Sequence, residues 1–159
     1  MLLDSRKWRP SVGSPGATLP QVFSAIESSL YLVGDETASS WTTDGGYLDA
    51  NSYYWSSENP WSSGAQSSIN RVGSEVHAAG KLWFPPVIAG YNKQLLGGQC
   101  VPRNGIATLD KDWSVNKTSG PDGWFAISWN EFVENTYLEP SRNYGSVYLD
   151  ELRNLVRSG

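Results

Sequence analysis

The chain has little cysteine and histidine, no long apolar segment and no excess of positive charge. Its 159 residues include one cysteine, Cys100, which excludes an internal disulfide and a metal site built from several thiolates. No apolar run approaches the ~20 residues that a membrane-spanning helix needs. With 12 basic and 16 acidic side chains, the formal net charge of −4 argues against nucleic acid as a partner, because such proteins present a basic face.

Patterns that hold cofactors are also missing. The single histidine, His77, is expected at the surface near the carboxyl end of a helix, and no spacing of metal ligands occurs. The glycines at 97, 98 and 105 do not stand in the strand–GxGxxG–helix order of a phosphate-binding loop. We therefore expect neither a cofactor nor a bound metal.

Aromatic side chains are abundant. Eight Trp, eight Tyr and four Phe make up 13% of the chain. Exposed rings offer flat surfaces on which sugars or bases stack. Since the charge disfavours nucleic acid, the composition favours carbohydrate as the partner, with no nucleic acid and no membrane. The length is typical of one domain, spanning residues 1–159.

The opening segment, MLLDSRKWRPSVGSPG, lacks the apolar stretch of about 7–15 residues found in a secretory signal. Two alternatives stay open: a protein that is not exported by that route, or a longer parent, secreted or not, whose amino terminus lies outside this sequence. The compartment is therefore left open.

Short apolar runs alternate with amphipathic segments along the chain. Strands are expected at 30–33, 47–49, 81–87 and 124–129. Helices are expected at 18–29 with Thr18 as the N-cap, from Ser62 or Ser63 to 79, at 108–117 with Thr108 as the N-cap, and at 145–157. This alternation predicts an α/β fold with a parallel sheet of about four strand–helix units.

The loops that follow the expected strands are long and carry most of the acidic and aromatic residues. In a (β/α) barrel these loops gather at the carboxyl-terminal face, where such enzymes keep their active sites. Asp35 and Glu36 leave the first strand, and Asp49 and Asn51 follow the second. We expect these four residues and Trp55, in the aromatic loop NSYYWSSENPW, to bind substrate.

The most informative segment is WFAISWNEFVENTYLEPSRNYG, at 124–145. Its strand leads into a loop that carries Asn130, Glu131, Glu134 and Glu139. Period-two alternation places Ala126, Ser128 and Asn130 toward a barrel interior, and Phe125, Ile127 and Trp129 under helices. Glycosidic cleavage needs two carboxyl groups, about 5–5.5 Å apart in retaining enzymes and about 6.5–9.5 Å in inverting ones.

The stretch ISWNEFVENTYLEPSRNYG resembles the closing strand and loop of the glycoside hydrolase family 99-like (β/α)8 barrels, which include endo-α-mannosidases. FPPVIAGYN, the arginine of PRNG, a helix containing Trp113, and PDGWFAISWNE precede it in the matching order. The resemblance covers 81–156 and implies a partial (β/α)8 TIM-type barrel, the carboxyl-terminal half of such a fold, with a sugar-cleaving site.

Carried over by motif, the resemblance assigns Tyr91, Arg103, Asn130 and Glu131 to that site, and Glu134 and Glu139 fall on recurring acidic positions of the loop. From their place at the end of a strand we expect Glu131 and Glu134 to be catalytic, and Tyr91, Arg103, Asn130 and Glu139 to bind substrate. In the mannosidases the catalytic glutamates lie on an earlier strand, in a motif resembling H-x-E-P-Y that this chain lacks, so the alternative is that Glu131 and Glu134 bind substrate.

The length separates three functional hypotheses. A (β/α)8 barrel typically needs about 250 residues, so this chain is equivalent to roughly half of one. Unpaired strand edges are then expected near 30–33 and 124–129 or at their neighbours, and a homodimer or an amino-terminal half-barrel is expected to complete the sheet. The leading hypothesis is a glycoside hydrolase-like protein that cleaves or binds polysaccharide. The alternatives are a non-catalytic carbohydrate-binding remnant and an assembly module.

Overall fold

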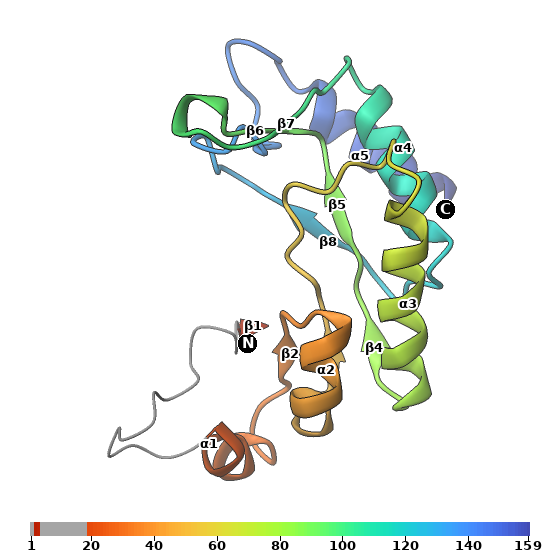
Figure 1. Cartoon of the computed structure of the whole chain (residues 1–159). Helices are drawn as coiled ribbons and strands as arrows, with labels where there is room; N and C mark the ends of the chain where they lie inside the picture. The colour runs from red at the N-terminus through yellow and green to blue at the C-terminus, as the bar shows by residue number, and fades with distance from the viewer. Residues whose placement is uncertain (1, 4–18) are drawn as a thin grey trace.

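The computed structural model describes residues 2–3 and 19–159. Its main sheet contains parallel strands in chain order, β1 (Leu2–Leu3), β2 (Val33–Gly34), β3 (Ala50–Asn51) and β4 (Leu82–Trp83). Just beyond β4, strand β5 (Pro86–Ile88) pairs in parallel with β8 (Phe125–Ile127). A short antiparallel hairpin, β6 (Tyr91–Asn92) and β7 (Cys100–Val101), follows β5 (Figure 1).

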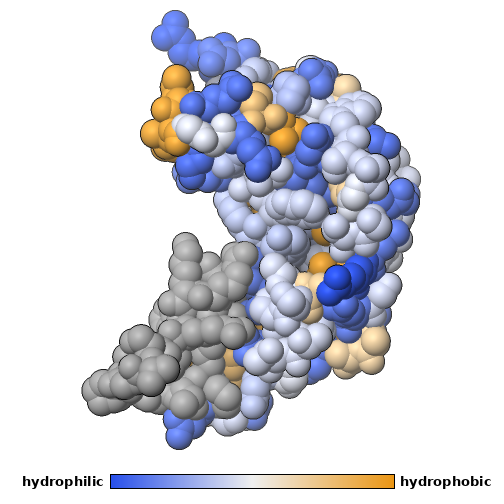
Figure 2. Space-filling model, in the orientation of Figure 1, coloured by the Kyte–Doolittle hydropathy of each residue, from blue (hydrophilic) through white to orange (hydrophobic). Residues whose placement is uncertain are grey.

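Helices connect the parallel strands. They are α1 (Leu19–Ile26), α2 (Ala38–Asp44), α3 (Ala65–Ala78), α4 (Ala107–Lys117) and α5 (Val147–Ser158), with 3-10 turns η2 (Gly45–Tyr47) and η3 (Gln94–Leu96). Figure 1 shows α3, α4 and α5 along one side of the strands. In the same orientation, Figure 2 shows the molecule curving around a hollow below the β6–β7 hairpin. The predicted alternation of parallel strands and helices is confirmed, and the described residues form no closed barrel.

One edge of the sheet lies at a neighbour of the expected segment. Residues 30–33 are not the open edge, because β1 pairs with β2 in the register Leu2 to Val33, and β1 is the edge strand of the described sheet. The apolar start of the chain supplies this additional strand. At the other side β8 is an edge strand within the described residues, as predicted for 124–129. Ala126, in the middle of β8, is exposed.

Strand positions were predicted to within about three residues. The second expected strand, at 47–49, lies at 50–51 instead, because Tyr47 ends a 3-10 turn and Leu48 is 1% exposed in the core. The third, at 81–87, divides into β4 and β5, with Phe84 and Pro85 between them. Trp129 was expected under helices, and this is wrong: its side chain is 54% exposed, whereas Ile127 is fully buried.

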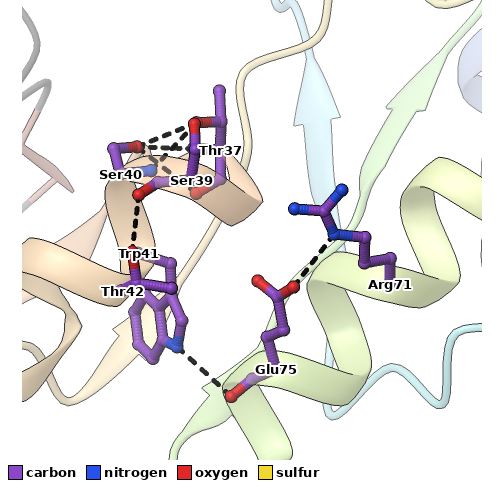
Figure 3. Close-up of polar contacts among 7 residues, drawn as sticks. All are labelled: Thr37, Ser39, Ser40, Trp41, Thr42, Arg71 and Glu75. Carbon is purple, nitrogen blue, oxygen red and sulfur yellow. Dashed lines mark hydrogen bonds and ion pairs between the residues drawn. The ribbon is translucent and has the colours of Figure 1, made fainter.

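The polar segment at 38–44 was predicted as loop and forms α2. Thr37 closes a capping box with Ser40: the Ser40 amide donates to Thr37 Oγ1 at 3.2 Å, and the Thr37 amide donates to Ser40 Oγ at 2.9 Å (Figure 3). Trp41 then packs into the core and donates from Nε1 to the Glu75 carbonyl of α3 at 3.2 Å. This short helix makes the close crossover from β2 to β3 possible.

Two predicted helix caps are wrong. Gly64, and not Ser62 or Ser63, is the N-cap of α3 and provides no side-chain hydrogen bond. Thr108 lies inside α4, where its hydroxyl donates to the Pro102 carbonyl at 2.6 Å. The cap expected at Thr18 lies outside the described residues.

Two apolar clusters fill the space between strands and helices. The first lies between β2–β4 and helices α1–α3 and includes Phe23, Trp41, Ile69, Val76 and Trp83. The second lies between β5 and helices α4 and α5 and consists of Val87, Ala89, Leu109, Trp113, Leu138 and Tyr148. Trp113 stacks on Trp124 at 3.7 Å between ring centroids. The second cluster is therefore the support for the loop that follows β8.

Side chains of α4 satisfy one edge of β5. Phe125 of β8 donates to the Pro85 carbonyl at 3.0 Å, so the alternate residues Pro86 and Ile88 direct their backbone groups to the other edge. There Asp112 Oδ2 accepts from the Ile88 amide and Asn116 Nδ2 donates to the Pro86 carbonyl, each at 2.9 Å. Asp112 and Asn116 are four residues apart on one helical face, and together they take the place of a neighbouring strand.

A buried carboxyl pair closes this arrangement. Glu58, from the loop before α3, and Asp112 are both fully buried, and Asn116 Nδ2 also donates to Glu58 Oε2 at 3.2 Å. Burial raises the pKa of Glu58 to about 7, and burial followed by the charge of Glu58 raises the pKa of Asp112 well above its ordinary value. Glu58 Oε1 and Asp112 Oδ1 have no other partner among the described residues, so a proton shared between the two side chains satisfies both.

We predict that stability falls as the pH rises through neutrality. The folded-state pKa of Glu58, about 7, lies above its ordinary value of 4.5, so the folded protein retains a proton that the unfolded chain releases in this interval. This stabilisation is complete below pH ~4.5 and is lost through pH ~7, on the order of 3 kcal/mol in the unfolding free energy. Glu58→Gln should flatten the decline and exceed the wild type in stability at pH 8, measured by urea unfolding from pH 5 to 8.

The exposed Glu27→Gln is the matched control and should keep the wild-type slope. Parallel curves for Glu58→Gln and the wild type would contradict the shared proton.

Candidate active site

The carboxyl ends of β2 and β8 bring three acidic side chains to the surroundings of Tyr54. The Tyr54 amide donates to Asp35 Oδ1 at 2.7 Å, and the Tyr54 ring meets Phe125 of β8 edge-on at 6.4 Å. Burial raises the pKa of Tyr54, and the charges of Glu134, Glu131 and Asp35 raise it further. The predicted residues Asp35, Glu131 and Glu134, with Tyr91 of β6 also acting on Tyr54, therefore lie at one site.

Glu134 is held by partners from two other loops. Its Oε1 accepts from Lys93 Nζ at 2.9 Å and its Oε2 accepts from Ser56 Oγ at 3.1 Å. The hydrogen bond and charge of Glu134 raise the pKa of Lys93. The Asn92 amide also donates to the Glu134 carbonyl at 2.8 Å, which joins this loop to the β6–β7 hairpin. Both oxygens of the Glu134 carboxylate and its backbone carbonyl are thus held in place.

Glu131 is half-buried and less constrained. Its Oε1 accepts from the Val133 amide at 3.0 Å, and its own amide donates to Ser128 Oγ at 2.9 Å. These bonds form a tight turn directly after β8. Glu131 and Glu134 therefore share a turn whose two ends are fixed to β8 and to the hairpin.

Arg103 lies beneath the acidic loop. It is 6% exposed, and its Nη2 donates to the carbonyls of Asn135 at 2.9 Å and Tyr137 at 2.7 Å. Its guanidinium carbon lies 4.9, 4.7 and 4.3 Å from the ring centroids of Tyr137, Tyr144 and Tyr148. Such contacts stabilise a cation on aromatic faces. Arg103 was expected to bind substrate. Its buried position instead favours a structural role, in which Arg103 supports the loop from below.

Two further predicted residues are buried. Asn51, fully buried, accepts from the Glu36 amide through Oδ1 and donates to the Glu36 carbonyl through Nδ2, each at 2.9 Å. Glu36 is also fully buried. The Asn51 side-chain amide joins the end of β2 to β3. Neither Asn51 nor Glu36 is exposed, so these two residues are not placed to bind substrate as predicted.

Asp49 lies at the opposite end of the sheet from the acidic loop. It precedes β3, because the strand starts three residues later than predicted, and its Oδ2 accepts from the Leu32 amide before β2 at 2.7 Å. Its charge and that of Asp122 raise the pKa of Tyr31, after the larger effect of burial. Asp49 therefore belongs to the amino-terminal face, and the prediction of a place at the site is wrong.

The remaining predicted residues are more exposed. Asn130 lies open to solvent directly after β8, and Glu139 is half-buried, with its amide donating to the Trp129 carbonyl at 2.9 Å. Trp55 packs against the first apolar cluster, beside Tyr53 at 5.5 Å between ring centroids, and lines a groove between α2 and α3. Trp55 is therefore on a different face from Tyr54.

Sequence reasoning missed Lys93 and Ser56, and it included Tyr54 only as part of the aromatic loop NSYYWSSENPW. Lys93 and Glu134 are 41 residues apart, and Ser56 and Glu134 are 78 apart, so no local pattern joins them. One general signal in the sequence pointed to Lys93: several carboxylates in one loop require a positive charge nearby.

Within the described ranges, no three His, Cys, Asp or Glu side chains are grouped so as to hold a metal ion. In residues 2–3 and 19–159, none of the helices combines the length and apolar character needed to cross a membrane.

Solved structures resemble this arrangement of strands and loops. A GH99 endo-alpha-mannosidase from Bacteroides thetaiotaomicron superimposes with a TM-score of 0.66 and 18% sequence identity, over 80% of this chain and 43% of that one. The chain has the fold of part of a GH99 enzyme. The same enzyme in complex with bis-tris-propane matches with a TM-score of 0.60 and 18% identity, over 81% of this chain and 48% of that one.

The predicted resemblance to family 99-like proteins is thus confirmed for the fold. The chain spans less than half the length of either matched structure. No protein-family model matches the sequence, and no curated protein matches it.

We predict that Arg103→Lys destabilises the acidic loop. Lysine keeps the charge but lacks the planar guanidinium that donates to two carbonyls while facing three rings. The unfolding free energy should fall by about 2–4 kcal/mol, and amide exchange across 131–138 should accelerate. Urea unfolding and hydrogen-exchange mass spectrometry measure both.

The exposed Arg142→Lys serves as control and should change neither quantity. Wild-type exchange across this loop in Arg103→Lys would contradict the supporting role.

Proposed function

We propose that this chain is a glycoside hydrolase-like protein whose acidic face, around Tyr54, Glu131 and Glu134, binds and cleaves glycans. One observation carries the proposal: two carboxylates lie in one turn at the carboxyl end of a parallel strand, opposite Asp35 and Tyr54. The fold shared with part of an endo-alpha-mannosidase supports it.

The chemistry requires one carboxyl group that donates a proton to the leaving oxygen and one that acts as nucleophile or activates water. Glu131 and Glu134 supply this pair. Lys93 Nζ donates to Glu134 Oε1 and orients this carboxylate, and Tyr54 adds an aromatic face and a hydroxyl beside both groups. Tyr91, Asn130 and Glu139 would extend the binding surface around them.

A carbohydrate-binding remnant without catalysis is the second candidate. It is favoured by the exposed position of Ala126 on β8, an edge strand within the described residues. The acidic and aromatic face would then bind sugar without the rest of the barrel. Only the open sheet edge at β8 supports the third hypothesis, an assembly module.

Hydrolysis of aryl glycosides and of α-linked manno-oligosaccharides tests the leading proposal. Glu131→Gln and Glu134→Gln should each lower turnover by about 10²–10⁴-fold, since amides neither donate nor accept the required proton. The exposed Glu27→Gln should turn over like the wild type. Circular dichroism checks that each variant is folded.

Binding of the same oligosaccharides without turnover would replace the leading proposal by the remnant. The absence of both binding and turnover would overturn both.

Completion of the sheet by a homodimer or by an amino-terminal half-barrel stays a prediction. The molar mass in solution, measured by light scattering, should be twice that of the 17.5 kDa chain if a second copy supplies the missing strands. A monomer at all concentrations would contradict the homodimer.

A further inference from the structure

A groove of about 590 Å³ lies between α2 and α3, on a different side of the 53–55 loop from the acidic face. The start of α2 lines one side with Thr37 and Ser39, and α3 lines the other with Ser68 and Arg71. Tyr53 and Trp55 form the end that reaches the loop. Figure 3 shows the two helices facing one another across this region.

Arg71 is anchored but has donors to spare. Its Nε donates to Glu75 Oε1 at 3.0 Å, one helical turn further along α3. The side chain is 65% exposed, and in Figure 3 its two terminal nitrogens point away from Glu75. Neither nitrogen donates to another described residue. The ion pair with Glu75 therefore orients the guanidinium while leaving its planar fork open to a ligand.

The lining combines three kinds of group. Hydroxyls from Thr37, Ser39 and Ser68 offer donors and acceptors, and the rings of Tyr53 and Trp55 offer apolar surface. Arg71 is the one cation among the described lining residues, and no carboxylate is among them. This charge is opposite to that of the acidic site, where Asp35, Glu131 and Glu134 lie close to Tyr54.

These groups fit a ligand with a ring that packs on aromatic side chains, several hydroxyls and a planar anionic group. A guanidinium fork recognises carboxylates through two parallel hydrogen bonds. Sugar rings stack on Trp and Tyr, and hydroxyl-rich walls exchange hydrogen bonds with sugar hydroxyls. A saccharide that carries a carboxylate has all three features.

We propose that the groove between α2 and α3 binds acidic saccharide, with a uronate carboxylate on Arg71 and a sugar ring against Trp55. The groove contains neither Glu131 nor Glu134, so binding there does not depend on cleavage at the acidic face. It would hold a stretch of polysaccharide beside that face.

The test is titration of the whole chain with tetragalacturonate and with its methyl-esterified, uncharged form, followed by isothermal calorimetry. The Glu131→Gln/Glu134→Gln double variant is titrated in parallel to exclude cleavage. We expect the acid to bind at least tenfold more tightly than the ester, and the affinity to fall as NaCl is raised. Arg71→Gln should weaken binding of the acid at least tenfold, and Trp55→Ala should weaken both forms.

Arg153→Gln is the matched control, because Arg153 is also an exposed arginine in an ion pair within one helix, with Asp150 at 2.6 Å. It should bind like the wild type. Equal affinity for acid and ester, or an unchanged Arg71→Gln, would overturn the proposal, as would no binding of either probe. Loss of turnover in the double variant with binding retained would separate the groove from the acidic site.

Discussion

The arrangement of this protein depends on the hydrogen bonds by which α4 satisfies the free edge of β5. Strand β5 follows β4 and pairs with β8 on one edge only. Without α4 on its other edge, the Pro86 carbonyl and the Ile88 amide would be buried without partners. An unsatisfied buried backbone group costs about 1–3 kcal/mol. Asn116 and Asp112 remove that cost for both groups, and they fix α4 against the strand at the same time.

Much of the acidic face follows from this attachment. Residues of α4 and β5 form the second apolar cluster, on which Leu138 and Tyr148 pack. Arg103, just before α4, reaches from that cluster to the carbonyls of the loop that carries Glu131 and Glu134. The loop is thus organised by a buried cation below it and by Lys93 at its side. Two cations, Arg103 below the segment and Lys93 at its side, therefore keep a carboxylate-rich turn in place.

The buried pair Glu58 and Asp112 shows that the same attachment has a cost. Asp112 is placed where a backbone amide needs an acceptor, yet its second oxygen then lies with the carboxyl group of Glu58 in the buried interior. A shared proton resolves the conflict at acid and neutral pH. The hydrogen bonds that hold the fold and the pH at which it is stable are therefore linked through one side chain.

Several elements were readable from local pattern. Apolar spacing located α3, α4 and α5 to within about two residues, and the SWNEFVEN segment identified the acidic turn after β8. In contrast, α2 was missed because its sequence is polar, and it is stabilised by a capping box and by the burial of Trp41. Asp49 was misplaced because β3 begins about three residues later than predicted. Asp49 therefore precedes the strand and lies at the opposite face.

The sequence by itself determined the class of fold, the succession of strands and helices, and which loop carries the carboxylates. These properties depend on periodicity and on residues close together in the chain. Only the tertiary structure decided that Arg103 supports the loop, that Lys93 and Ser56 hold Glu134, and that Trp55 lines a groove apart from Tyr54. Each of those contacts joins residues tens of positions apart or depends on the direction in which a loop turns, and the path of the backbone in space decides both.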